Sequence, residues 1–221
     1  MVRKSIAWLI PLAITVLGAD VRAQAQTTNN FEIEYKTVTQ IFEFQQPDIV
    51  RAVITGTSTS PAPFGLDSFI SNTYGRRDTS NPPLIKISFN SEPTALGLPS
   101  SLESFSDSYF GGPNTLSGKA NDSAEINPVA GTIQGGGTIT IFDGTGIFEN
   151  ATGKVTFTQQ DTFDPSAPPG PVPGAAILKF AIQTPVQKVP EYTPTYTLVS
   201  ASLIGAVLFK GRKRQKANSL L

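Results

Sequence analysis

The chain has 221 residues, of which 17 are basic and 17 acidic, and it contains neither cysteine nor histidine. Without cysteine it has no disulfide framework, thiolate metal site or cysteine nucleophile, and without histidine it has no Ser-His-Asp triad, histidine-zinc site or haem-histidine site. The formal net charge of zero conceals a split: residues 26–188 carry 15 acidic and nine basic side chains, and this acidity argues against a nucleic-acid partner.

Residues 1–25 have the three-part pattern of a secretory signal peptide. The pattern consists of a basic start, an apolar stretch and small side chains at the cleavage positions: Arg3 and Lys4, residues 6–17, and Ala23 with Ala25. The apolar stretch is shorter than the about 20 residues that a spanning helix needs, which favours cleavage over an uncleaved anchor. The sequence therefore predicts an exported protein whose mature chain begins at Gln26.

Stretches with a period of two predict β-strands in the mature chain. From Phe31 to Lys36, apolar and polar side chains alternate, which is typical of a half-buried strand, and the pattern continues to Phe44. Further strands are expected over residues 48–55, 84–89, 118–127, 138–142, 154–158 and 175–182, with weak pairing over 102–110.

Clusters of glycine, proline, asparagine and aspartate predict turns and loops at residues 78–83, 90–101 and 111–114, and a proline-rich loop over 164–174. Asp143-Gly144 is expected to close a tight hairpin, because this dipeptide accepts positive φ angles. The glycines of 135–137 are interpreted as a backbone turn. Residues 64–74, whose large apolar side chains have helix-like spacing, are interpreted as a short irregular segment.

These elements predict one all-β domain over residues 26–188, and their pattern leaves open whether it is an antiparallel β-barrel or a β-sandwich. A Gly-Thr-Gly-x-Phe-x-x-Ala-x-Gly pattern runs from Gly144 to Gly153. It resembles a segment of small β-barrels of the allene oxide cyclase and dirigent type. The resemblance implies a barrel topology and assigns no catalytic residue.

The last 33 residues, 189–221, combine a short polar motif, an apolar run and a basic cluster. Residues 196–209 are expected to form an apolar transmembrane helix, which is short for a span but can be extended by the snorkelling side chain of Lys210. The positive-inside tendency would hold the following basic stop, residues 210–216, on the cytoplasmic side. This stop contains Lys210, Arg212, Lys213 and Arg214.

Val189, Pro190 and Glu191 stand at the head of this segment. Their order before the apolar run and the basic cluster resembles the PEP-CTERM sorting signal of bacterial exported proteins, which an exosortase-type transpeptidase processes. Tyr192 departs from the family pattern, in which a second proline usually stands there. The resemblance implies membrane anchoring before processing, cleavage near Pro190-Glu191 and a final place at the cell surface or in the extracellular matrix. A plain tail anchor is the alternative.

No residue pattern in the mature domain marks a specific activity, so we expect a non-enzymatic envelope or matrix protein with no cofactor. The expected partners are the export machinery, the exosortase-type enzyme, the membrane through the tail, and extracellular polysaccharide. One alternative is a carbohydrate-binding or adhesin module that uses exposed rings of Tyr74, Phe105, Tyr109 and Phe110. A second is a secreted hydrolase that works through a carboxylate pair.

Two pairs of acidic residues could offer oxygen ligands to calcium, namely Asp161 with Asp164 and Asp143 with Glu149. Neither pair has the ligand density of a known calcium loop. The favoured interpretation is solvated turn carboxylates, so no metal site is expected.

Overall fold

β-Strands make up most of residues 26–44 and 46–185, the part of the chain that the computed structural model describes. The expected signal peptide and its cleavage residues, and the sorting tail with its apolar helix and basic stop, lie outside the described residues and stay predictions. Within the described part, the only helices are three short 3-10 turns, none of them able to span a membrane.

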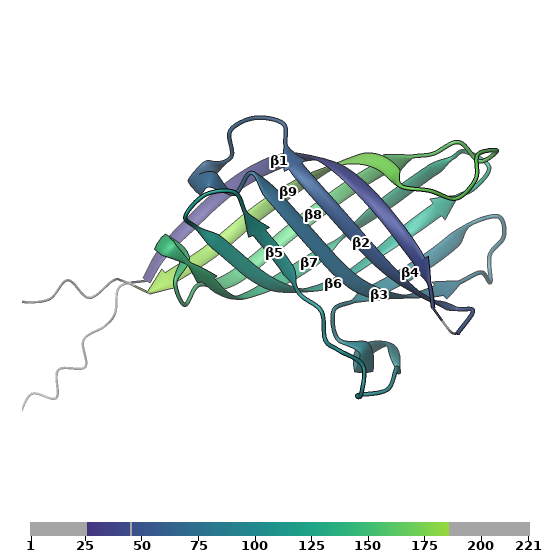
Figure 1. Cartoon of the computed structure of the whole chain (residues 1–221), viewed down its shortest axis with the longest axis horizontal. Helices are drawn as coiled ribbons and strands as arrows, with labels where there is room; N and C mark the ends of the chain where they lie inside the picture. Colours follow the sequence, from purple (N-terminus) through teal and green to yellow (C-terminus); the bar gives the residue numbers. More distant parts are fainter. Residues whose placement is uncertain (1–25, 45, 186–221) are drawn as a thin grey trace, which may run out of the picture. The chain divides into compact units, whose positions relative to one another are not determined.

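Nine strands pair antiparallel throughout (Figure 1). They are β1 (Gln26–Glu43), β2 (Ile49–Ser58), β3 (Ser68–Asp78), β4 (Ile85–Asn90), β5 (Asp107–Phe110), β6 (Thr115–Asn127), β7 (Thr132–Thr145), β8 (Thr152–Thr162) and β9 (Val172–Pro185). The 3-10 turns are η1 (Pro63–Gly65), η2 (Pro93–Leu96) and η3 (Gly146–Phe148). The all-β prediction is confirmed.

The sheet closes in a ring, so the domain is a barrel. Its strand order is β2-β1-β9-β8-β7-β6-β4-β3-β5, and a further pairing of β2 with β3 closes the circle. β4 and β5 are two halves of one position in the wall: both pair with β3 on one side and with β6 on the other. The ring thus has eight positions, one of them shared by β4 and β5.

Residues 91–106 leave the wall between β4 and β5 and return to it, and they form the loop seen below the barrel in Figure 1. The loop packs on the outer side of β2 and β3, where Leu98 joins Ile49 and Tyr74 in a small buried cluster. The ring of Phe105 stacks on Tyr74 with centroids 4.6 Å apart. At its base, the Ser91 hydroxyl accepts a 2.8 Å hydrogen bond from the backbone N–H of Ala120 in β6.

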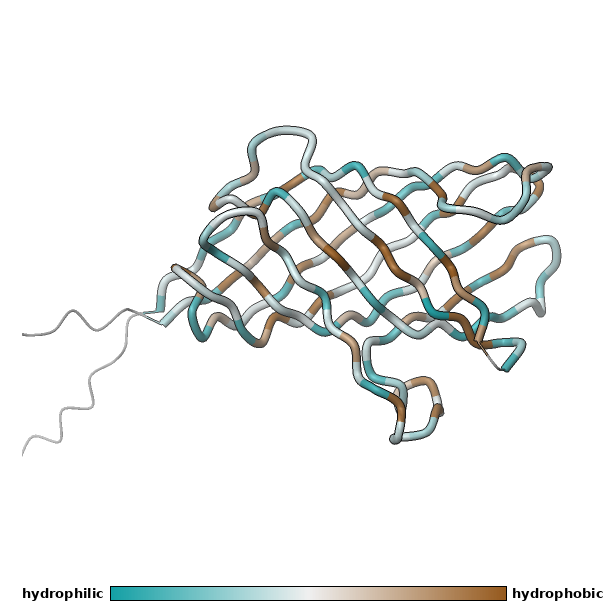
Figure 2. Tube along the Cα trace, in the orientation of Figure 1, coloured by the Kyte–Doolittle hydropathy of each residue, from teal (hydrophilic) through white to brown (hydrophobic). Residues whose placement is uncertain are grey.

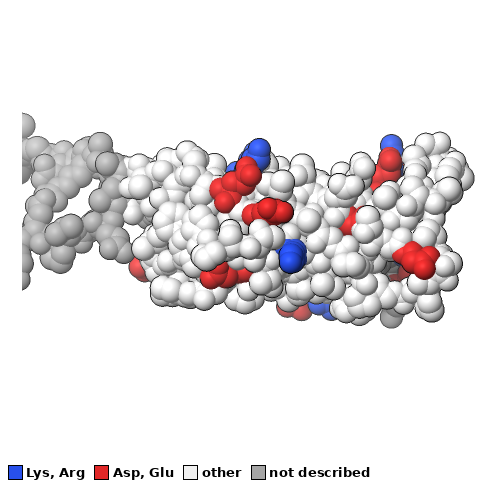
Figure 3. All heavy atoms as spheres, turned by 90° about the horizontal axis from the view of Figure 1, so that it is seen from above, with Lys and Arg blue, Asp and Glu red and all other residues white. Residues whose placement is uncertain are grey.

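Polar and apolar residues follow one another at short intervals along the strands (Figure 2). In β1 and β9 the burial pattern shows that this alternation separates the interior from the surface. In β1, the side chains from Ile33 to Thr39 are buried at every second position. The same period in β9 buries alternate residues from Ala176 to Thr184. On the face seen in Figure 3, charged side chains of both signs are scattered among uncharged ones, without a basic patch.

An aromatic plug, made of Phe31, Phe64, Phe148 and Phe180, fills the barrel end at which the described chain enters and leaves. Phe31 stacks on Phe180 with centroids 4.6 Å apart, and Phe64 meets Phe148 edge-on at 5.3 Å. Gln26 pairs with Pro185, which places both ends of the described chain at this end. The Gly-Thr-Gly-x-Phe segment supplies part of the plug, because it forms the η3 turn that carries Phe148.

Three local predictions were wrong. Residues 68–74 of the segment expected to be irregular belong to β3, because pairing with β2 on one side and with β4 and β5 on the other overrides the helix-like spacing. The glycines of 135–137 lie inside β7: a Cβ at Gly137 would stand 2.3 Å from Cβ of Asp122, so they mark a close approach of strands.

The third wrong prediction concerns the hairpin turn. Asp143 and Gly144 still pair with β6, and the chain reverses later, between Gly146 and Ala151. Gly146 and Asn150 have the positive φ angles, 66° and 57°, that this turn requires. The hairpin itself, β7 followed by β8, was predicted correctly.

Candidate functional site in the barrel interior

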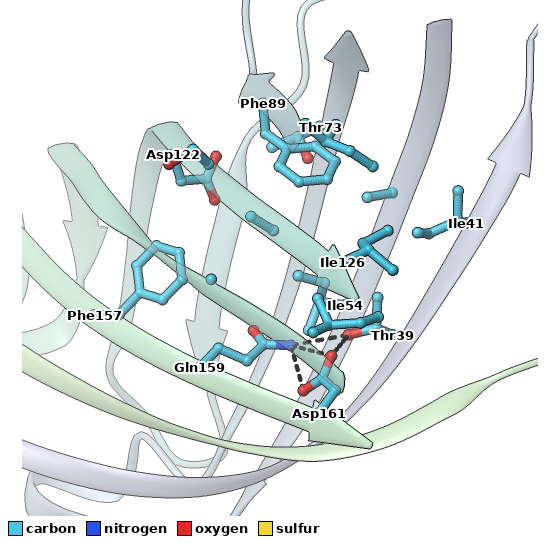
Figure 4. Close-up of a pocket in the computed structure, with 16 residues that line it drawn as sticks. Thr39, Ile41, Ile54, Thr73, Phe89, Asp122, Ile126, Phe157, Gln159 and Asp161 are labelled. Atoms are coloured by element: carbon cyan, nitrogen blue, oxygen red, sulfur yellow. Dashed lines mark hydrogen bonds between the residues drawn. The ribbon is translucent and has the colours of Figure 1, made fainter. Parts of the chain in front are cut away.

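The half of the barrel away from the aromatic plug is hollow (Figure 4). This interior hollow has a cavity volume of about 40 Å³. A second space of about 20 Å³ adjoins it toward the plug, and the two share Ile54, Asp122, Phe157 and Gln159 as walls. Both are slender spaces between closely spaced side chains.

Small inward-facing residues explain the hollow. Ala52 in β2, Ala124 in β6 and Gly135 in β7 face it at positions where the plugged half carries rings or larger aliphatic side chains. In a barrel of about eight strands, large side chains fill the interior, whereas smaller ones leave space for a ligand. The choice of side chain at the inward positions therefore decides which half is solid.

The wall contains two sets of polar side chains, and the first is a hydrogen-bonded network around Asp161 of β8. Its carboxylate accepts a 2.9 Å bond from the Thr39 hydroxyl, and Gln159 donates from Nε2 to both of its oxygens at 2.9 and 2.8 Å. Burial raises the pKa of Asp161, and the bonds from Gln159 and Thr39 counteract that rise. Gly174 on β9 leaves room for this carboxylate, because a Cβ at position 174 would lie 1.8 Å from Oδ1 of Asp161.

Asp107 and Asp122 form a second set of polar side chains, and these have fewer hydrogen-bond partners than Asp161. Asp107 in β5 is 2% exposed, and both residues line the second space. Oδ1 of each carboxyl is buried without a hydrogen-bond partner among the described residues, and so is Oγ1 of Thr37 on β1. Such groups are uncommon in folded proteins and call for an explanation.

Burial determines the protonation of this pair. Loss of solvent on burial raises the pKa of Asp107 to about 8, and the nearby charge of Asp122 also raises it. Hydrogen bonds from the hydroxyls of Ser71 and Tyr109 act in the opposite direction and lower it. Burial likewise raises the pKa of Asp122 to about 7. Near neutral pH, Asp107 is mostly a neutral carboxylic acid, which is how an apolar site keeps such a group uncharged.

A wide mouth leads to the interior hollow from the barrel end opposite the plug. The mouth and the interior hollow share Thr39, Ile41, Ile126 and Ile133 as walls. Residues 163–173 line one side of the mouth. The proline-rich loop predicted for 164–174 is confirmed over 164–171, and the remaining residues belong to β9. At the rim, Arg77 donates two hydrogen bonds of 2.8 and 2.6 Å to the Glu43 carboxylate.

The structure separates one of the two residue pairs considered for calcium. Asp161 lies inside the barrel, whereas Asp164 lies in the exposed loop and accepts bonds from the backbone and hydroxyl of Ser166. Asp143 and Glu149 are exposed, on β7 and in the turn after it. Across the described residues, no group of three or more acidic side chains is placed to hold a metal ion.

The four aromatic residues considered for sugar stacking do not form an exposed platform. Tyr74 and Tyr109 are buried, and Phe105 packs on the outer cluster with Tyr74. Phe110 alone is exposed, at 41%. Exposed rings were considered only for the carbohydrate-binding alternative, and packing against the core was the favoured interpretation; three of the four rings do pack, because the loop at 91–106 folds back onto the barrel and β5 enters its wall.

Asp107 and Asp122 were missed by the sequence reasoning. For Asp122 a signal existed: it shares the period-two face of Ala120, Ala124 and Ile126, so an acid stands on an otherwise small or apolar face. For Asp107 no local signal existed, because its strand has only four residues and its inward face depends on pairing with β3 and β6.

No protein-family model matches this chain, and no curated protein matches it either.

Proposed function

We propose that this chain is an exported binding protein whose barrel takes up a slender amphipathic small molecule. The observation that carries the proposal is the pair of carboxyl oxygens, on Asp107 and Asp122, that are buried without a partner beside a hollow. A bound ligand with a polar head would satisfy them. The protein acts by binding, without a cofactor.

The lining of the interior hollow supports the amphipathic character of the ligand. Aliphatic and aromatic side chains, among them Ile41, Ile54 and Phe157, form most of the wall, and the polar groups are few. This is the usual composition of a small-molecule site, in which apolar contacts give affinity and a few polar groups orient the ligand. The open mouth gives the apolar part a route to the inside.

The carboxylate pair is also what a histidine-free hydrolase would need. Such an enzyme requires space for a sugar and a water molecule between two carboxyls that differ in protonation. Here burial raises the pKa of both Asp107 and Asp122, and the space beside them is slender. These features support binding over catalysis.

The binding function is tested with six-carbon amphiphiles: hexylamine, 1-hexanol and hexanoate. Burying such a chain at about 0.8 kcal/mol per CH₂ gives about 4–5 kcal/mol, which corresponds to a Kd near 1 mM or below. We expect at least one to shift amide NMR signals of residues around the interior hollow. Ile54→Trp, which fills both adjoining spaces, should weaken this binding at least tenfold.

Ile177→Trp is the matched control, because Ile177 faces outward on β9 and is 40% exposed. It should leave the titration unchanged. Failure of all three amphiphiles to bind would refute the cavity function, as would full binding by Ile54→Trp.

We further propose that the domain reaches the cell envelope or extracellular matrix as the sequence predicts, through a cleaved signal and a PEP-CTERM-like tail. The support for this proposal is the sequence pattern at the two ends, namely the basic start, apolar stretch and small cleavage residues of 1–25 and the motif, apolar run and basic cluster of 189–221. Extracellular polysaccharide is the proposed partner of the outer surface. There, uncharged pairs such as Thr138 with Thr156 and Gln134 with Gln160 offer hydroxyl and amide groups.

Processing of the tail is tested by mass spectrometry of the protein isolated from its host. We expect an N-terminus at Gln26 and a C-terminus near Pro190-Glu191. A Glu191→Ala variant should accumulate uncleaved, because the change removes the acidic residue of the motif. A native protein that still ends at Leu221 would contradict sorting by an exosortase-type enzyme and favour a plain tail anchor.

A further inference from the structure

The described interior of the barrel carries acidic side chains and no basic one. Asp107, Asp122 and Asp161 face inward from β5, β6 and β8, and the inward positions of β2, β4, β7 and β9 are uncharged. The other titratable groups inside are the buried hydroxyls of Tyr35 and Tyr109. At the rim, Arg77 is neutralised by its bidentate pair with Glu43.

The unpartnered atoms in this interior can all accept hydrogen bonds. Two are carboxyl oxygens, of Asp107 and Asp122. The third is the hydroxyl of Thr37, which faces the Asp161 carboxylate and helps to lower its pKa, so it belongs with the Asp161 network and not with this pair. Asp161 already receives bonds from Thr39 and Gln159. Once one carboxyl of the pair is ionised, the complement that is missing is a compact hydrogen-bond donor with a positive charge.

We propose that the head group bound by Asp107 and Asp122 is a primary ammonium, so that the ligand is a slender organic amine. This inference rests on the cavity function proposed above. An ammonium group brings three N–H donors and no acceptor, and its bonds to carboxylates are charge-assisted. The rings of Phe89 and Phe157 line the interior hollow at the level of Asp122 (Figure 4), and the apolar part of the amine extends from there toward the mouth along Ile41, Ile126 and Ile133.

Binding of an amine displaces a proton from the pair. In the free protein, burial keeps both carboxyls protonated in mild acid, with pKa values of about 8 for Asp107 and about 7 for Asp122. A cation beside them favours the ionised form, so one carboxyl releases its proton to solvent while the other keeps its own. Affinity for the amine should then rise about tenfold per pH unit between pH 5 and pH 6.5.

The experiment compares hexylamine with 1-hexanol and hexanoate on the unmodified full chain, by calorimetry at pH 6 in two buffers of different ionisation enthalpy. We expect hexylamine to bind at least ten times more tightly than 1-hexanol, with release of about one proton, and hexanoate to bind weakest. Because the unmodified protein is used, no variant has to fold for the comparison to be decided.

Each outcome has one meaning. Tighter binding of hexylamine with proton release supports the amine site. If 1-hexanol or hexanoate binds as tightly as hexylamine, or if no proton is released, the amine inference is overturned while the cavity function stands. If none of the three binds, the cavity function fails and the inference fails with it.

Discussion

Asp107→Asn is expected to stabilise the protein at pH 9 and to destabilise it at pH 5. At pH 5 the native Asp107 is a neutral acid, and the amide adds N–H donors without partners, which costs about 1–3 kcal/mol. At pH 9 the native side chain is an ionised carboxylate in a buried site, and the neutral amide removes that charge. The variant should therefore be more stable than the native protein in alkali, by at least about 1 kcal/mol.

The sign follows from proton counting. Burial raises the pKa of Asp107 to about 8 and that of Asp122 to about 7 in the folded protein, whereas in the unfolded chain both titrate near 3.8. Between about pH 4 and those values the folded state binds more protons, so stability falls as pH rises, by up to about 1.4 kcal/mol per pH unit for each carboxyl. Without Asp107 this slope should be roughly halved.

Urea unfolding at pH 5, 7 and 9 measures the effect. Asp164→Asn is the matched control, because Asp164 is exposed and a hydrogen bond from Ser166 lowers its pKa. The control should lack the change of sign between pH 5 and pH 9. If Asp107→Asn shifts stability in the same direction and by the same amount at both pH values, Asp107 is not a neutral acid in the native barrel.

Phe148→Ala should cost about 3–5 kcal/mol of unfolding free energy, the range for removing a buried ring from a core. Phe148 is 0% exposed, and its ring meets those of Phe64 and Phe31 with centroids 5.3 and 6.4 Å apart. The deletion leaves a cavity in the aromatic plug, where the closed strands limit collapse around it.

Ile147→Ala provides the comparison, because Ile147 precedes Phe148 in the same turn and is 48% exposed. Its change should stay within about 0.5 kcal/mol, as is usual for surface substitutions. Thermal and urea unfolding of both variants measure the difference. A loss below about 1 kcal/mol for Phe148→Ala would show that the plug is not part of the cooperative core.

The plug and the interior hollow show how one barrel combines stability with a site. Rings fill the end at which the described chain enters and leaves, and small residues such as Ala52 and Gly135 leave space toward the mouth. Without disulfides, stability must come from the plugged half and the closed hydrogen-bond ladders. This frees the other half to hold poorly satisfied polar groups.

The chemical limits of the protein and most of its strands follow from the amino-acid sequence alone. The absence of cysteine and histidine needs no coordinates, and the period of two correctly placed the long strands β1, β6 and β9 and the pairing of β7 with β8. It also placed the proline-rich loop. These features are local: alternation and turn residues act over a few neighbours in the chain.

Long-range pairing, which no local pattern shows, established that the sheet closes, that residues 68–78 are a strand, and that Asp107 and Asp122 face the same interior space. Closure depends on β1 pairing with both β2 and β9, whose residues lie far apart in the sequence. The short strand β5 has an inward face only because β3 and β6 flank it. A period of two tells which side chains share a face, whereas long-range hydrogen bonds decide which face becomes the interior.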